Sequence, residues 1–152
     1  MPLSFFDRLA DPEATKPELS PHSLEYMRRL KEAVGRDLTA LLNTRRVDDF
    51  DGSFEESTKS LLTFGVIDFT AFNLTSELDQ ERVRYSVERA IRQFEPRLAR
   101  LIVTLEQADS SNLILHLRIE AFLRNESRRE AVSFGMTLHR DSRRIVVSGA
   151  DA

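Results

Sequence analysis

The chain has 152 residues, 41% of them hydrophobic, so it can bury one core and form one domain with short tails. Its net charge of −3 lacks the basic excess usual in nucleic-acid-binding domains. The absence of cysteine excludes disulfides and thiolate chemistry, and the apolar runs are far below the roughly 18 residues that a membrane helix needs.

Residues 1–19 are predicted to form an amphipathic segment and linker, followed by a domain over 20–147 and a disordered tail over 148–152. Two adjacent phenylalanines near the start need burial, either on this domain or on a partner. The start lacks the positive region and apolar stretch of a signal peptide, so a cytoplasmic location is expected. The apolar side chains of this segment are Leu3, Phe5, Phe6 and Leu9.

A long helix is predicted from Ser20 to about Leu42. Ser20 is expected to cap its start, with Pro21 at the first helical position. Gly35 interrupts the helix at a cost of about 1 kcal/mol, which suggests a close backbone approach there. One apolar stripe recurs at three- and four-residue spacing: Leu24, Met27, Leu30, Val34, Leu38 and Leu41.

A loop is expected over 43–53, then a short helix over 53–62. Asp48, Asp49 and Asp51 in the loop form either a solvated turn or a calcium site, although they lack the EF-hand spacing. Residues 63–69 read as an apolar loop, which we expect to pack across the mouth of the core.

A second helix is predicted to follow Ser76, with Asp79 completing a capping box. Its opposite face carries Arg84, Glu88 and Arg92 at four-residue spacing, so these side chains can pair along a solvated surface for a few tenths of a kcal/mol each. The buried stripe of this helix comprises Val83, Val87, Ala90, Ile91 and Phe94.

After this helix the hydrophobic period changes to two. The alternation predicts strands over 99–106, 113–123, 132–138 and 145–147, with Ala99 and Leu101 on the same buried face. The short turns between them favour antiparallel hairpins. The fold class is therefore predicted to be α+β, a two-layer sandwich in which a long N-terminal helix and a second helix pack on a small, mainly antiparallel four-stranded sheet.

The segment Phe94-Glu95-Pro96-Arg97-Leu98 marks a corner between helix and strand. Proline cannot continue a helix, and it pushes the preceding residue toward an extended conformation. The corner thus carries Glu95 and Arg97 on either side of Pro96. Arg97 can hold a partner carboxylate through two hydrogen bonds; the alternative is an internal Glu95–Arg97 pair that fixes the corner.

Residue types that carry chemistry are scattered. The histidines at 22, 116 and 139 are far apart and no paired-ligand motif exists, so no metal is expected. There is no GxSxG nucleophile motif and no glycine-rich phosphate loop, so no cofactor is expected either. Many carboxylates are present, but their spacing nominates no pair for glycoside hydrolysis.

Three segments together resemble the TssE family, the small baseplate proteins of bacterial type VI secretion systems. That family is similar to a phage-tail baseplate wedge family labelled gene 25-like lysozyme. The resemblance covers about residues 3–123 and includes the start, Ser4 to Leu9. One departure is Val66-Ile67, where family members often carry Leu-Pro. The three segments are Leu41-Leu42-Asn43-Thr44-Arg45, 62–69 and 94–98.

The resemblance implies a non-catalytic structural protein that joins wedge subunits and gives the contractile sheath its first docking surface. It implies a cytoplasmic position at an inner-membrane-docked baseplate, without membrane insertion, nucleic acid or cofactor. The family's signature contact maps onto Glu95, Pro96 and Arg97, and we add Phe5, Phe6 and Leu9 as candidate partner-binding residues. An open edge at the last strand would allow a strand of the sheath to pair there.

Two other functions stay open. The family label suggests a peptidoglycan-cleaving muramidase, which would need a buried carboxyl group facing a second one across a cleft. A small module that binds nucleic acid or another ligand would need a basic groove with exposed aromatic residues. Arginine pairs at 28–29, 45–46, 128–129 and 143–144 hint at such a groove, but neighbouring acidic residues offset them.

Overall fold

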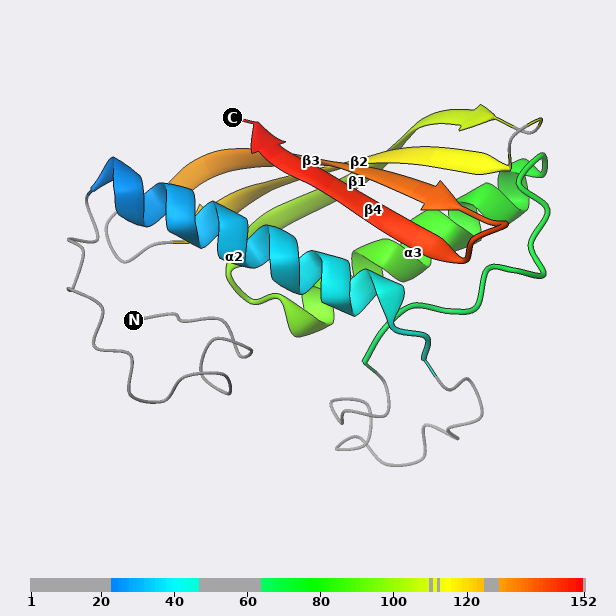
Figure 1. Ribbon diagram of the computed structural model, residues 1–152, viewed down its shortest axis with the longest axis horizontal. Coiled ribbons are helices and arrows are strands. Elements are labelled where there is room, and N and C mark those ends of the chain that lie inside the picture. The colour runs from blue at the N-terminus through cyan, green and yellow to red at the C-terminus, as the bar shows by residue number, and fades with distance from the viewer. Residues whose placement is uncertain (1–22, 47–63, 110, 112, 125–128, 152) are drawn as a thin grey trace.

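A computed structural model describes residues 23–46, 64–109, 111, 113–124 and 129–151. Two helices come first, α2 (Leu24–Asn43) and α3 (Glu77–Phe94). Four strands follow: β1 (Leu98–Asp109), β2 (Ile114–Arg124), β3 (Arg129–His139) and β4 (Arg144–Asp151). They form one sheet in the order β1-β2-β3-β4, and every neighbouring pair is antiparallel (Figure 1). The predicted α+β fold is confirmed.

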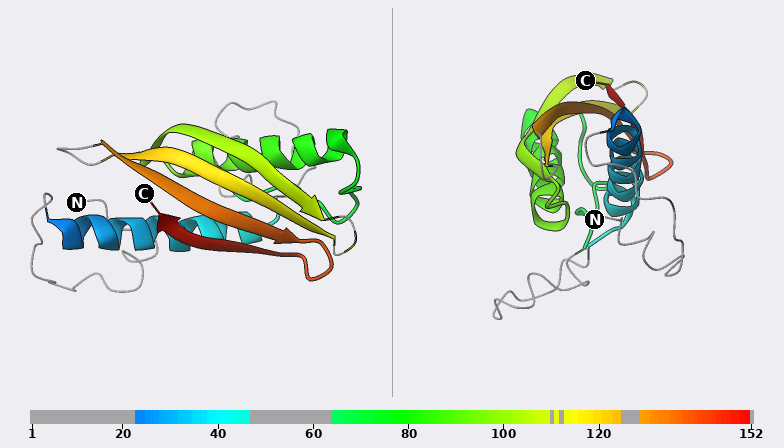
Figure 2. Two further views of the ribbon diagram at one scale, coloured as in Figure 1. Left: turned by 90° about the horizontal axis from the view of Figure 1, so that it is seen from above. Right: turned by 90° about the vertical axis from the view of Figure 1, so that its left-hand side faces the viewer.

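Both helices lie on one face of the sheet, which we call the inner face. Seen from its end, the sheet curves over them, with α2 beneath β4 and α3 beneath β1 (Figure 2). Strand side chains alternate between this face and the outer face, and burying the apolar set drives folding. The largest fully buried side chains are Phe69, Phe134, Leu38, Leu42, Leu74, Ile91, Leu115, Leu117, Ile119, Leu123, Met136 and Leu138.

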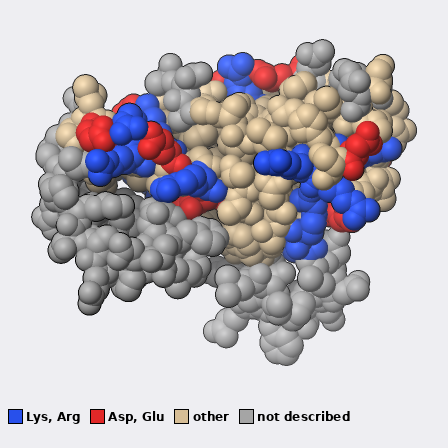
Figure 3. Space-filling model, in the orientation of Figure 1, with Lys and Arg blue, Asp and Glu red and all other residues tan. Residues whose placement is uncertain are grey.

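The helix α2 begins later than predicted. Its N-cap is Ser23, because the Ser23 Oγ accepts a hydrogen bond from the Tyr26 N–H at 3.1 Å. The prediction of Ser20 as the cap was therefore wrong, and Ser20 and Pro21 lie outside the described residues. Acidic and basic side chains are interspersed over the exposed side of α2 (Figure 3), where ion pairs join Glu25, Arg28, Arg29 and Glu32.

The glycine within α2 does not mark a close backbone approach, contrary to the prediction. A methyl group added at Gly35 would meet the Phe134 Cε1 at 3.7 Å, an ordinary van der Waals distance. We expect Gly35→Ala to stabilise the protein by about 0.5–1 kcal/mol, because alanine loses less backbone entropy than glycine in a helix. Urea denaturation would show a higher midpoint; a lower one would contradict the spacing between α2 and β3.

The helix α3 lacks the predicted capping box. Ser76 occupies the N-cap position, but its side chain makes no capping hydrogen bond. The Asp79 Oδ2 instead accepts a hydrogen bond from the Asn73 N–H at 2.9 Å, because the chain turns back before the helix. The buried stripe is confirmed, with Phe94 partly buried beside the fully buried Val83, Val87, Ala90 and Ile91.

The apolar loop before α3 packs against the core, as predicted, and buries Val66 and Phe69. A short parallel bridge ties this loop to the residues after α2. The Val66 N–H donates to the Thr44 oxygen at 3.0 Å, and the Arg46 N–H donates to the Val66 oxygen at 2.9 Å. The helix predicted over 53–62 and the aspartates at 48, 49 and 51 lie outside the described residues.

The strand β1 changes face near its start. A bulge lies between Ala99 and Ile102, and Arg100 within it has a φ of 52°. Leu101 is consequently buried, whereas Ala99 is paired with Phe122, which is on the outer face. The prediction that Ala99 and Leu101 share the buried face was wrong, because the bulge breaks the period of two.

The strand β4 is longer than predicted. β4 continues to Asp151, which pairs with Ser133 of β3, so the disordered tail predicted from residue 148 was wrong over 148–151. A register shift between Phe134 and Gly135 lets the ladder run on past Ser148. Small residues with weak strand propensity form this part of β4, and pairing with β3 overrides that propensity.

Candidate functional site

The corner between α3 and β1 holds three of the predicted site residues. The Glu95 N–H makes the last helical hydrogen bond, to the Ile91 oxygen at 2.9 Å. The Leu98 N–H then donates to the Glu95 oxygen at 3.2 Å, which closes the turn around the exposed Pro96. The other predicted residues, Phe5, Phe6 and Leu9, lie outside the described residues.

Glu95 and Arg97 bind each other across the corner. The Arg97 Nε lies 2.6 Å from the Glu95 Oε1, and the Arg97 Nη2 lies 2.5 Å from the Glu95 Oε2. The Arg97 N–H also donates to the Glu95 Oε1 at 3.2 Å. Glu95 is only 4% exposed, and it is the one buried charged residue in the part of the chain that the structure describes. The internal pair considered above is therefore formed.

A third charged side chain joins this pair from α2. The Asp37 Oδ2 lies 2.5 Å from the Arg97 Nη2, so one guanidinium binds two carboxylates. The Arg97 Nη1 is buried without a hydrogen-bond partner. Sequence reasoning missed Asp37, although its position three residues after Val34 and four before Leu41 places a carboxylate on the apolar stripe of α2.

The charge on Arg97 is secured by these two carboxylates. Burial alone would lower the pKa of Arg97, but the hydrogen bonds and charge of Glu95, and then of Asp37, outweigh burial and raise the pKa above its usual value. The guanidinium therefore stays charged and joins α2, the end of α3 and the start of β1. A corner held from three elements presents Pro96 in a fixed direction.

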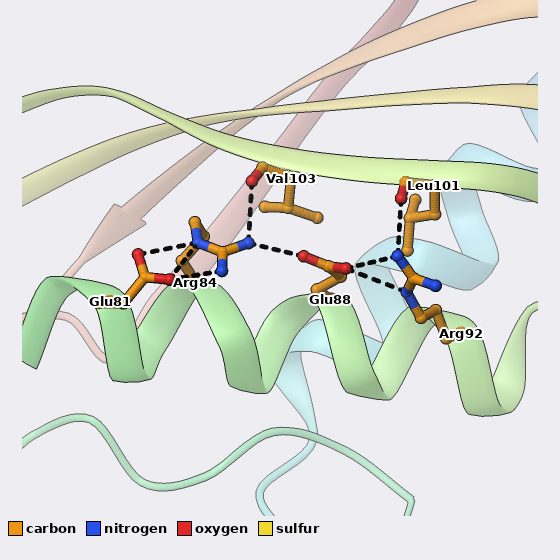
Figure 4. Close-up of polar contacts among 6 residues, drawn as sticks. All are labelled: Glu81, Arg84, Glu88, Arg92, Leu101 and Val103. Atoms are coloured by element: carbon orange, nitrogen blue, oxygen red, sulfur yellow. Dashed lines mark hydrogen bonds and ion pairs between the residues drawn. The ribbon is translucent and has the colours of Figure 1, made fainter.

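The charged face of α3 also contacts the sheet (Figure 4). The Arg84 Nη1 binds the Glu88 Oε2 at 2.6 Å and the main-chain oxygen of Val103 at 3.2 Å. The Arg92 Nη2 binds the Glu88 Oε1 at 2.6 Å and the main-chain oxygen of Leu101 at 3.0 Å. The predicted pairs are confirmed, but the face is not simply solvated, because both arginines hold the outer edge of β1.

The edge of β4 is held in a similar way by the end of α2. The Asn43 Nδ2 donates to the Ile145 oxygen at 2.8 Å, and the Ile145 N–H donates to the Asn43 Oδ1 at 2.9 Å. One amide side chain thus replaces a neighbouring strand at this residue. Arg45 adds a hydrogen bond to the Arg143 oxygen at 2.9 Å, while its guanidinium lies 4.1 Å from the Phe69 ring centre.

Asn43→Asp tests this contact, because the carboxylate keeps the acceptor and loses the donor. It would face the Ile145 oxygen without a hydrogen between them, and we expect a loss of about 2–3 kcal/mol in the free energy of unfolding. Asn73→Asp is the matched control. The Asn73 side chain acts through its Oδ1, which accepts hydrogen bonds from the Thr75 N–H and hydroxyl, and a carboxylate oxygen can accept both. Equal urea midpoints for the two variants would refute the strand-like role of Asn43.

The described residues contain no grouping of three or more acidic or histidine side chains suited to a metal ion. Both carboxylates of the corner bind one guanidinium, and this contact favours their charged form. A general acid of the lysozyme type instead lies in an apolar pocket that favours its protonated form. Among the described helices, neither has the length and apolar character needed to span a bilayer.

Comparison with protein-family models gives one match, to "Baseplate wedge protein gp25", over residues 28–128. The match begins within α2 and ends after β2, so it includes the asparagine at the end of α2, the apolar loop and the corner. A comparison with curated proteins gave no match. The matched region is well over half of the 152 residues, and the chain belongs to the family of the baseplate wedge protein gp25.

Proposed function

We propose that this protein is the TssE-type wedge subunit of a type VI secretion baseplate. The family match over residues 28–128 carries the proposal, because that family builds phage-tail-like baseplates. The resemblance of the Leu41–Arg45, 62–69 and 94–98 segments to TssE proteins supports the narrower assignment. In this role the protein is not an enzyme; it joins wedge subunits in the cytoplasm, at a baseplate docked on the inner membrane.

The corner is the proposed contact with a neighbouring wedge subunit. Glu95 and Arg97 are engaged with each other and with Asp37, so Pro96 is the exposed member of the motif. We assign the direct contact to Pro96, while Glu95 and Arg97 hold its direction. Phe5, Phe6 and Leu9 are proposed as a second contact.

The sheath is proposed to dock at the free edge of β4. Asn43 and Arg45 hold this edge at Arg143 and Ile145, so a strand would add beyond them, along 147–151. Hydrogen exchange on the purified protein, with and without the sheath subunit, tests this step. We expect added protection over 147–151 and none at Ile145; protection at neither place would count against strand addition.

A tagged pull-down from native cells, followed by mass spectrometry, tests the function. Wild type should recover baseplate and sheath subunits. Glu95→Ala/Arg97→Ala should lose them, whereas Glu106→Ala/Arg118→Ala, which removes an exposed pair of the same kind, should not. Because the first variant disturbs a buried cluster, Pro96→Gln is included to alter the exposed tip alone. Recovery of no baseplate subunit by wild type would refute the proposed function. Full recovery by all variants would refute the corner as the contact with a wedge subunit.

A further inference from the structure

A second surface lies on the outer face of the sheet, at the end of the β2–β3 hairpin. Arg124 of β2 and Arg129 of β3 are directly opposite each other in the ladder, and both are exposed. Within the described residues neither has an acidic partner. Like charges directly opposite each other across a strand pair are destabilising, so an acidic partner at Arg124 and Arg129 would relieve an unfavourable contact.

An apolar band lies beside these two arginines on the same face. Phe122 is two residues before Arg124 on β2, and it is paired with Ala99 on one side and Ala131 on the other. The small alanines leave the ring unshielded, and Phe122 is 36% exposed. Ile102, next along β1 beyond the bulge, is 58% exposed. An aromatic ring beside two arginines that have no acidic partner among the described residues has the composition typical of the centre of a protein interface.

The band is continuous with the corner. The Arg124 N–H donates to the Arg97 oxygen at 2.8 Å, so the arginine pair and the turn at Pro96 lie at the same end of the sheet. A partner seated on the corner can therefore reach Arg124 and Phe122 without leaving this end of the molecule. Glu120 lies two residues before Phe122 on the same face, so the positive charges on this face of β2 end at Arg124.

We propose that this outer surface, defined by Arg124, Arg129, Phe122 and Ile102, binds an acidic segment with at least one large apolar side chain, carried by a neighbouring baseplate subunit. The acidic groups would relieve the repulsion between the two arginines, and the apolar side chain would cover Phe122. Glu120 and the net charge of −3 disfavour a nucleic acid here. This proposal rests on the proposed function in one respect, which is that the partner is a baseplate subunit.

The probes are short fluorescent peptides that alternate leucine with glutamate, glutamine or lysine, together with a single-stranded oligonucleotide. Anisotropy titrations on the purified full chain would give affinities at low and at physiological salt. The glutamate–leucine peptide should bind most tightly, weaken with salt, and shift the amide signals of 99–102, 122–124 and 129–131 in NMR spectra. Tighter binding of the oligonucleotide, or no preference for the glutamate peptide, would overturn the proposal.

Charge reversal separates binding from stability. Arg124→Glu/Arg129→Glu should weaken the binding of the glutamate–leucine peptide at least about tenfold. The control Arg89→Glu/Arg144→Glu changes the net charge by the same amount at exposed sites elsewhere, and it should leave the affinity for the peptide unchanged. Arg129→Glu alone creates an opposite-charge pair with Arg124, so it should raise the urea midpoint while weakening the peptide. Unchanged affinity in that variant would mean that the arginines have no binding role, whatever the pull-down shows for the corner.

Discussion

Gly65→Ala is expected to destabilise the protein by at least about 3 kcal/mol. Gly65 has a φ of 117°, a backbone conformation that residues with a side chain rarely adopt. A Cβ at this position would also lie 2.3 Å from the Thr44 oxygen, which is main chain and cannot rotate away. Because Val66 and Thr44 are hydrogen-bonded in the short bridge next to it, relieving the clash would break the contact between the apolar loop and α2.

The measurement is urea denaturation followed by circular dichroism, with Gly149→Ala as the control. A Cβ at Gly149 would meet no atom within 4 Å, so this variant should change the free energy of unfolding by less than about 0.5 kcal/mol. If Gly65→Ala unfolds at the same urea concentration as Gly149→Ala, the bridge between the loop and α2 is not formed as described.

Arg97→Met should be destabilising by about 3–5 kcal/mol, because it leaves Glu95 and Asp37 largely buried without their cation. Urea midpoints of wild type and variant at neutral pH measure the loss.

Arg118→Met is the matched control for this prediction. It removes the arginine of an ion pair with Glu106 in which both side chains are at least 40% exposed. The free energy of unfolding should therefore fall by less than about 1 kcal/mol. Comparable losses for the two variants would mean that the corner cluster contributes no more than an ordinary surface pair. The rigid presentation of Pro96 would then lack its physical basis.

Most of the architecture follows from the spacing at which hydrophobic residues recur in the sequence. The stripe of α3 and the alternation in β2 were predictable because each element buries one face, and the buried residues then recur with the period of a helix or a strand. The corner was predictable because Pro96 cannot continue a helix. The features that escaped prediction are those in which period gives no signal. The bulge at Arg100 inserts an unpaired residue, and the small residues at the end of β4 gain their order only from pairing with β3.

The candidate site was only partly predictable for a related reason. Glu95 and Arg97 are two residues apart, so their pairing could be considered from sequence. Asp37 is 60 residues from Arg97 and Asn43 is 102 residues from Ile145, so the fold alone brings them together. The reach of Arg84 and Arg92 to the edge of β1 likewise depends on how α3 lies under the sheet. Helical spacing could predict only their pairing with Glu88.

The most direct test of the account is photo-crosslinking from the corner in living cells. A photoreactive amino acid at Pro96 should form a covalent adduct with a baseplate wedge subunit, and the adduct should disappear when that subunit is deleted. The same group at Glu77, exposed at the opposite end of α3, should give no such adduct. An adduct from Glu77 but not from Pro96, or none with any baseplate subunit, would contradict the claim that this corner joins the protein to its wedge.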